Sequence, residues 1–132
     1  MFLQELNWFL IELKKKIREK CLVFDYKNFK NLEKILQKLY EAHVIAGFSC
    51  IADDKNKWRI FLSYLNSGES SIHKIQIISN SKMEYSVSAY ILKKLKLKFP
   101  HMVSIIETQH GIMSGNECAI RNIGGIFLFY LM

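Results

Sequence analysis

The sequence has few cysteines, no long apolar run and no nucleotide-binding motif, and each shortage excludes a class of protein. Cys21, Cys50 and Cys118 are odd in number and far apart, without a C-x-x-C pair. They predict free thiols, a reducing compartment and no structural zinc. The apolar runs, such as residues 126–132, are too short to span a bilayer, so we expect no membrane contact. The sequence lacks a phosphate loop and a dinucleotide fingerprint, and we expect no cofactor.

Acidic residues are also scarce. Nineteen Lys and Arg residues face 12 Asp and Glu residues, which gives a net charge of +7. This charge suits a polyanionic partner, because each cation that neutralises a phosphate releases a counterion. General solubility is the alternative explanation. The single proline, Pro100, and the wealth of Ile, Lys, Asn, Phe and Tyr suggest an AT-rich coding genome, such as that of an organelle.

The chain of 132 residues is long enough for one domain or two small ones. Its first segment, from residue 2 to about residue 20, predicts a helix because apolar residues recur at intervals of three and four. The opposite face is cationic. It is either a solvated face that complements the helix dipole or an edge that contacts phosphates. Its cations are Lys14, Lys15, Lys16, Arg18 and Lys20.

The rest of the first half predicts a strand, a helix and a hairpin. Residues 21–26 are β-rich, and Asn28 is the expected N-cap of a helix that ends near His43 in a left-handed residue. Residues 44–51 and 57–65 form the hairpin around the turn at residues 53–56. Adjacent Asp53 and Asp54 are typical turn residues, and we do not expect them to be catalytic.

The second half is mainly β-rich. We expect strands at residues 72–78 and 85–91, a turn at residues 79–82, and a helix or extended segment through the lysines of residues 93–98. Residues 102–108 predict another strand, which stops at a polar turn closed by Gly111. Ser114 and Glu117 form a capping box for a short helix over residues 114–122. A glycine pair at residues 124–125 precedes the last apolar strand.

These elements predict an α+β fold of two small lobes, divided at the polar stretch of residues 66–71. The N-terminal lobe, residues 1–67, has the order α-β-α-β-β, with both helices on one face of a three-stranded sheet. The C-terminal lobe, residues 68–132, is mainly β with a short helix. It presents the loop of residues 107–110 outward between buried strands, a good position for recognition.

Residues 102–132 resemble the carboxy-terminal part of the family of bacterial-type small-subunit ribosomal protein eight. The resemblance covers nearly the whole chain but is specific only from about Ser81 onward. That family typically has Ser-Thr-Ser-Lys-Gly, two aliphatic residues, a Glu-Ala pair on a short helix, and Gly-Gly before a final strand. The matching residues fall in register without a gap: Thr108, Gly111, Ile112, Met113, Glu117, Ile123, Gly124 and Gly125. Glu107 and Gln109 replace the two serines, and His110 replaces the lysine. At the earlier turn only Ser81 and Lys82 of the family's Ser-Lys-Pro-Gly remain.

The resemblance implies a structural protein that binds a helical junction in the central domain of small-subunit ribosomal RNA during early assembly. Its neighbours would include small-subunit proteins five and seventeen. The compartment implied is the mitochondrial ribosome, with a plastid or bacterial cytoplasm as the alternative. The expected RNA-contacting residues lie in the loop, at the earlier turn and on the first helix: Glu107, Thr108, Gln109, His110, Gly111, Ser81, Lys82, Lys14, Lys15 and Arg18.

Two other functions compete with this one. The chain could be a protein-interaction or double-stranded-RNA-binding module outside the ribosome. An enzyme would need Glu107, His110 and Glu117 as acid–base groups and Cys118 as nucleophile. We expect no enzyme, because Glu117 is explained by the capping box and Cys118 occupies a small-residue position typical of inert packing.

Glu107 itself leaves two alternatives. A carboxylate only accepts hydrogen bonds, so it either accepts from an exposed base amino group or turns away to pair with a cation. The basic composition favours internal pairing, with Arg121 or His110 as the cation.

Overall fold

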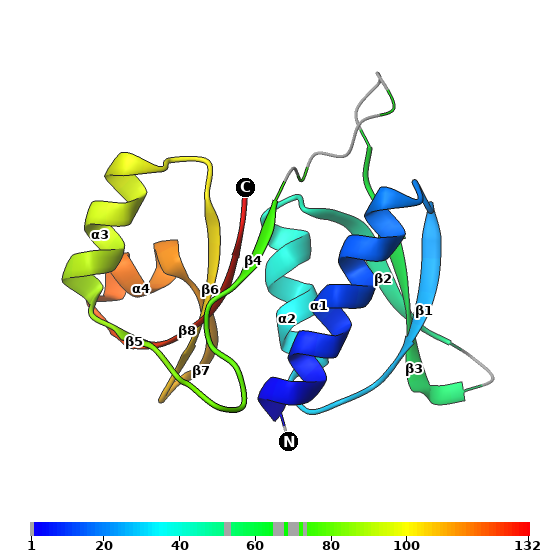
Figure 1. The fold of residues 1–132 in the computed structure, drawn as a ribbon, viewed down its shortest axis with the longest axis horizontal. Coiled ribbons are helices and arrows are strands. Elements are labelled where there is room, and N and C mark those ends of the chain that lie inside the picture. Colours follow the sequence, from blue (N-terminus) through cyan, green and yellow to red (C-terminus); the bar gives the residue numbers. More distant parts are fainter. Residues whose placement is uncertain (1, 52–53, 65–67, 69–71, 73) are drawn as a thin grey trace. The chain divides into compact units, whose positions relative to one another are not determined.

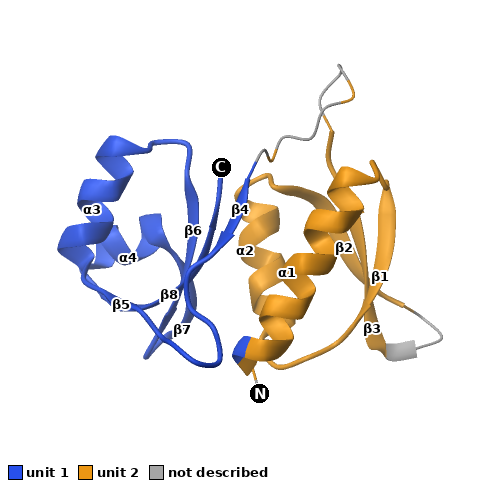
Figure 2. Cartoon of the chain, viewed as in Figure 1, with its two compact units in different colours: residues 1, 3, 74–132 blue, residues 2, 4–73 orange. Residues whose placement is uncertain are grey.

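The computed structural model describes residues 2–51, 54–64, 68, 72 and 74–132. Within these residues the chain forms four helices and eight strands, in the order α-β-α-β-β-β-β-α-β-β-α-β (Figure 1). They fall into two compact units, residues 2–73 and residues 74–132, except that residue 3 is grouped with the second unit (Figure 2). The expected α+β class is confirmed, with two antiparallel sheets. The boundary expected at residues 66–71 falls outside the described residues, apart from Gly68.

The N-terminal unit is a three-stranded antiparallel sheet of β1 (Val23–Lys27), β2 (Ile45–Ile51) and β3 (Asp54–Leu62), with β3 in the centre. Helices α1 (Phe2–Arg18) and α2 (Leu32–Glu41) cover one face of this sheet (Figure 1). Their apolar faces form the core, and a fully buried aliphatic side chain contributes about 1.5–3 kcal/mol to stability. The helix residues in this core are Leu6, Phe9, Leu10, Leu13, Leu32, Ile35, Leu36 and Leu39.

Helix α2 begins later than the sequence predicts. Asn28 is not its N-cap, because the helix starts at Leu32 after Asn31. Asn28 is instead held against β3: its N–H donates to the Asn56 carbonyl at 2.7 Å, and its side-chain oxygen accepts from Trp58 Nε1 at 3.3 Å. Asn28 therefore stabilises the neighbouring strand β3 instead of the helix. Its role depends on tertiary contacts.

The end of α2 agrees with the prediction. His43 adopts the left-handed conformation, with φ of 61°. Its N–H donates to the Tyr40 carbonyl at 3.0 Å, and the Val44 N–H donates to the Leu39 carbonyl at 2.9 Å. These two bonds define a Schellman motif, the usual end of a helix that turns sharply into a strand. His43 therefore has a structural role at a position that favours glycine.

The hairpin is shorter at its turn than expected. Strand β3 already begins at Asp54, so residues 54–56 belong to the strand and not to the turn. The strand also ends at Leu62, before the expected residue 65. Asp53 lies outside the described residues.

The C-terminal unit is a five-stranded antiparallel sheet. Strand β8 (Gly125–Leu131) pairs on one side with β4 (Ile75–Ile77) and β5 (Ser86–Val87), and on the other with β6 (Val103–Thr108). Strand β7 (Gly111–Ser114) completes the sheet beside β6. Helices α3 (Ala89–Lys98) and α4 (Gly115–Arg121) belong to the same unit. One buried cluster joins these elements: Leu92, Ile106, Met113, Cys118 and Phe127.

The strand predicted at residues 85–91 is confirmed only at residues 86–87, which form β5, and is wrong from Ala89 onward, where α3 begins. Pairing with β8 stops at Val87, and Ser88 then caps α3 by accepting a hydrogen bond from the Ile91 N–H at 3.3 Å. Ala89 and Leu92 bury on the helix, while Tyr90 and Ile91 are exposed. The alternation of apolar and polar residues is typical of a strand and led to the prediction. The N-cap and the three-residue spacing of the buried positions are instead typical of a helix.

Candidate nucleic-acid interface

The β6–β7 turn is the best-defined part of the expected site. Thr108 pairs with Gly111 across the turn, and Gly111 has a φ of 98°, a conformation that favours glycine. The Thr108 hydroxyl accepts from the His110 N–H at 3.0 Å. Its own proton has two acceptors in reach, the Gly111 carbonyl at 3.0 Å and Met113 Sδ at 3.3 Å. The Thr108 hydroxyl, which was expected to contact RNA, therefore holds the turn closed.

The loop is less outward-facing than predicted. Gln109 and His110 are exposed at its tip, but Glu107 and Thr108 belong to β6 and are half-buried. Within the described residues, no ion pair joins Glu107 to Arg121 or His110, so the internal pairing favoured from the sequence is not seen in the unbound chain. The backbone of Glu107 is held between Ile112 on β7 and Ile126 on β8.

The glycine pair fixes the base of the turn. A Cβ on Gly125 would lie closer than 3.0 Å to the Glu107 carbonyl oxygen, and one on Gly124 would lie 2.6 Å from the Val87 carbonyl oxygen. Real Cβ atoms essentially never approach other atoms so closely. Only glycine lets β8 begin tightly between β5 and β6. The sequence pattern at these positions therefore has a steric cause.

A second loop carries Ser81 and Lys82, which are both exposed. Asn80 organises it, since its side-chain oxygen accepts from the N–H groups of Lys82 at 2.9 Å and Met83 at 3.0 Å. This is the local bonding that makes asparagine a turn residue. The role of Asn80 was missed, although its place within the predicted turn was a usable signal.

Buried Ser79 anchors this second loop to the sheet. Its hydroxyl donates to the Phe127 carbonyl at 2.6 Å and accepts from the Tyr85 N–H at 3.0 Å. Phe127 pairs with Ile106, so the base of the loop joins β8 next to the strand that carries the β6–β7 turn. The β6–β7 turn and the loop of Ser81 and Lys82 are thus both attached to the same sheet.

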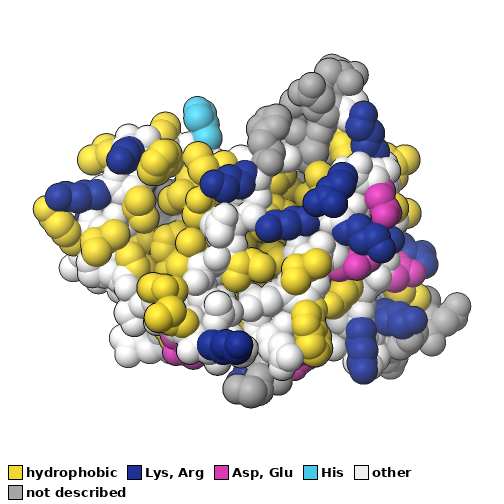
Figure 3. Space-filling model, viewed as in Figure 1, with side chains coloured by type: hydrophobic (Ala, Val, Ile, Leu, Met, Phe, Trp, Pro, Cys, Tyr) yellow, Lys and Arg dark blue, Asp and Glu magenta, His cyan; other side chains and the backbone are white. Residues whose placement is uncertain are grey.

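The basic residues of α1 lie in the N-terminal unit. Lys15 and Arg18 are exposed and Lys14 is half-buried, whereas Lys16 pairs with Glu12 at 3.7 Å. Figure 3 shows Lys and Arg side chains gathered over the region of this helix. Among the described residues, Lys14, Lys15 and Arg18 therefore have no carboxylate partner and form a positive surface.

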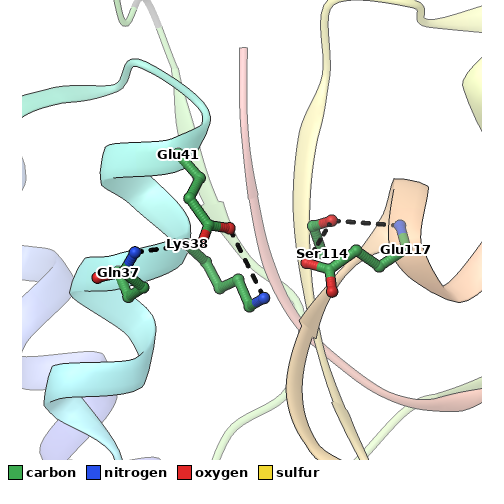
Figure 4. A network of polar contacts seen from close by, with 5 residues as sticks. All are labelled: Gln37, Lys38, Glu41, Ser114 and Glu117. Carbon is green, nitrogen blue, oxygen red and sulfur yellow. Dashed lines mark hydrogen bonds and ion pairs between the residues drawn. The ribbon is translucent and has the colours of Figure 1, made fainter.

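The short helix α4 has the predicted cap. Ser114 Oγ accepts from the Glu117 N–H at 3.3 Å and lies 3.3 Å from Glu117 Oε1 (Figure 4). Cys118, the next residue, is fully buried. Burial raises the pKa of its thiol, and the Glu117 carboxylate raises that pKa further. A buried thiol that holds its proton is a poor nucleophile.

The described residues give little support to other kinds of site. No three His, Cys, Asp or Glu side chains among them gather closely enough to hold a metal ion. Over the same part of the chain, no helix is long and apolar enough to cross a membrane.

Comparison with known proteins assigns this two-unit α+β fold to a family. The family model described as ribosomal protein S8 matches residues 6–132, and the chain belongs to this family. It is 31% identical over 99 residues to small ribosomal subunit protein uS8 of Thermodesulfovibrio yellowstonii, covering 70% of each chain. It is 27% identical over 119 residues to uS8 of Rickettsia bellii, covering 88% of this chain and 87% of the relative.

A mitochondrial relative is also similar. Small ribosomal subunit protein uS8m of Dictyostelium discoideum is 29% identical over 93 residues, which cover 70% of this chain and 60% of that relative's length. The resemblance stated from the sequence is thereby confirmed, including its divergence. The family is structural and non-enzymatic, so the chain is a structural protein of the small ribosomal subunit and not an enzyme.

Proposed function

We propose that this protein binds the central domain of small-subunit ribosomal RNA at a helical junction and supports early assembly of the subunit. The β6–β7 turn carries the proposal, because it presents Gln109 and His110 from a base fixed by Thr108 and by two β-ladders. Double-stranded RNA displays a wide, shallow minor groove, and irregular bases are where sequence is read. A narrow, ordered turn fits such a surface.

Each residue of the turn has a chemical role in this proposal. The Gln109 amide both donates and accepts, so it can bond a base edge or a 2′-hydroxyl, and His110 adds a ring donor. The Thr108 hydroxyl keeps one lone pair free for RNA while it holds the turn. Because Glu107 forms no ion pair with any cation that the structure describes, its carboxylate is assigned to accept from a base amino group. Gly111 lets the chain reverse beneath them.

The second loop and α1 supply sequence-independent contacts. Ser81 offers a hydroxyl and Lys82 a cation at the exposed Asn80 turn. On α1, Lys14, Lys15 and Arg18 are assigned to phosphates, whose neutralisation makes binding salt-dependent.

The turn is tested with a synthetic fragment of the chain's own ribosomal RNA junction. Gln109→Ala should weaken binding by about 1–3 kcal/mol, the value of one good base contact. Glu107→Ser should weaken it as well, because a shorter, neutral hydroxyl replaces the charged carboxylate acceptor. Gln76→Ala, at an exposed β4 position, is the matched control. Parent-like affinity of the Gln109 variant, or tighter binding of the Glu107 variant, would contradict the roles assigned here.

The basic surface has a separate test in the salt dependence of binding. Replacing Lys14, Lys15 and Arg18 with Gln should flatten the plot of log affinity against log salt by roughly one unit per lost phosphate contact. The control replaces Lys27 and Lys57, which lie opposite each other in the β1–β3 ladder. An unchanged slope in the α1 variant would show that this face is only solvated.

The cellular setting is proposed to be the mitochondrial ribosome, with proteins five and seventeen of the small subunit as neighbours. The organelle-like composition and the similarity to a mitochondrial relative support this compartment. Bacterial relatives are similar to the same degree, so a plastid or the bacterial cytoplasm is the alternative. Sedimentation of mitochondrial ribosomes in high salt tests it, with mass spectrometry of the small-subunit peak. Absence of the chain from that peak would move the assignment to another compartment or to a module outside the ribosome.

A further inference from the structure

The α3–α4 side of the C-terminal unit contains an apolar groove that takes no part in the proposed RNA contacts. The groove has a volume of about 570 Å³ and is lined by residues of α3, of α4 and of the segment after α3. Two large aliphatic side chains are almost fully accessible there, Leu97 at 85% and Ile120 at 78% exposure. The remaining lining residues are Lys93, Lys96, Pro100 and Ala119.

The exposure of these side chains is not accounted for by the folding of the unit. Helix α3 packs inward with Ala89 and Leu92, so Leu97 projects from the helix without joining the core. Single exposed aliphatic residues are common on protein surfaces. Here Leu97 and Ile120 come from two different helices and line the same hollow. Figure 3 shows hydrophobic side chains gathered over the region of α3, with Lys and Arg side chains among them.

The charge around the groove indicates what would cover it. Lys93 and Lys96 line the groove, and α3 contains no acidic residue. The Lys93 ammonium donates to the Asn122 side-chain oxygen at 3.4 Å, and this partner is neutral. The ammonium of Lys94 lies over the Tyr90 ring at 4.6 Å. In the part of the chain that the structure describes, Lys93 and Lys96 pair with no carboxylate, so they remain available for carboxylates brought by another molecule.

We propose that the α3–α4 groove docks an acidic, amphipathic helix of a neighbouring ribosomal protein. Aliphatic side chains three or four residues apart on that helix fill the space between Leu97 and Ile120, and flanking Asp or Glu residues pair with Lys93 and Lys96. RNA is the other anionic partner within reach. It does not suit this surface, because aliphatic walls offer neither hydrogen bonds nor an aromatic ring to stack on.

The proposal goes beyond RNA binding and has its own test in intact small subunits. A photoreactive phenylalanine analogue replaces Leu97, and the control carries it at Met83, an exposed loop residue of the same unit. After irradiation, mass spectrometry identifies the attached peptide. We expect Leu97 to attach to a ribosomal protein at a segment with Asp or Glu within four residues of the attachment point, and Met83 not to attach there.

Charge reversal then tests the lysines. Lys93→Glu with Lys96→Glu should reduce this attachment at least fivefold, whereas Lys74→Glu, at an exposed position of the same unit, should leave it unchanged. Attachment of Leu97 to ribosomal RNA, to this chain itself or to a segment without acidic residues would overturn the proposal. An equal loss of attachment in the Lys93/Lys96 double variant and in the Lys74→Glu variant would also overturn it. If the double variant is not incorporated into subunits, the proposal is still tested by the peptide that attaches to the photoreactive group at position 97 when both lysines are unchanged.

Failure of this proposal is distinguishable from failure of the RNA assignment. The double lysine variant should keep its affinity for the RNA junction fragment, because the groove is not part of the turn. A parallel loss of junction affinity would show that the lysines bind RNA, and would overturn the docking proposal alone.

Discussion

Replacing Gly125 with alanine tests how the base of the β6–β7 turn is built. The new Cβ would lie closer than 3.0 Å to the Glu107 carbonyl oxygen and 3.1 Å from its carbonyl carbon. Both are backbone atoms, which cannot rotate away as the end of a side chain can. Strand β8 must therefore separate from β6 where Ile126 pairs with Glu107.

The expected loss of stability follows from that separation. Overpacking costs about 1–3 kcal/mol, and each weakened ladder hydrogen bond adds about 0.5–1.5 kcal/mol. We therefore expect Gly125→Ala to lower the free energy of unfolding by about 2–4 kcal/mol. Affinity for the RNA junction should fall too, because the displaced strand carries the turn.

Urea denaturation followed by circular dichroism measures the effect, with Gly47→Ala as the matched control. Gly47 also lies in a strand, but a Cβ there would meet nothing within 4 Å. Its replacement should leave stability within about 1 kcal/mol of the parent, since alanine also restricts the unfolded chain. If Gly125→Ala unfolds like the parent, or if both variants lose the same stability, the steric argument is refuted.

Four further predictions concern single side chains. Thr108→Val should lower the free energy of unfolding by about 1–3 kcal/mol, whereas Thr108→Ser keeps the hydroxyl and should stay near the parent; equal values would show that the turn does not need this hydroxyl. Ser114→Ala should cost about 1 kcal/mol in urea denaturation, and an unchanged midpoint would mean that the cap contributes nothing. His43→Gly should stabilise by up to about 1 kcal/mol, because it relieves a left-handed residue; a less stable variant would contradict that reading. Since burial raises the Cys118 pKa, native Cys118 should react with iodoacetamide far more slowly than exposed Cys50 from pH 7 to 9, and equal rates would disprove its burial.

Elements set by local chemistry could be predicted from the sequence. The first helix follows from its three- and four-residue spacing, and its expected apolar face is the one that buries. Ser114 and Glu117 mark the start of α4, because a capping box lies within four neighbouring residues. The left-handed His43 was predictable for the same reason, as a local feature of a helix end.

Features set by tertiary partners could not be predicted in this way. Asn28 bonds to β3 and does not cap α2, because Asn56 and Trp58 come close only in the folded sheet. At residues 85–91 the alternating pattern was misleading, since Ser88 ends the pairing with β8 and starts a helix. The inward bonding of Thr108 depends on where Gly111 and Met113 lie across the turn.

The doubly paired position of β6 has a consequence for the timing of RNA capture. Because ladders to β7 and β8 and the Thr108 hydroxyl already hold the turn, the chain should lose little conformational freedom on binding RNA as proposed above. Encounter then depends on diffusion and on the attraction of a +7 chain for phosphates. The rate of association should fall steeply with added salt. The lifetime of the complex, which the rigid turn governs, should change much less.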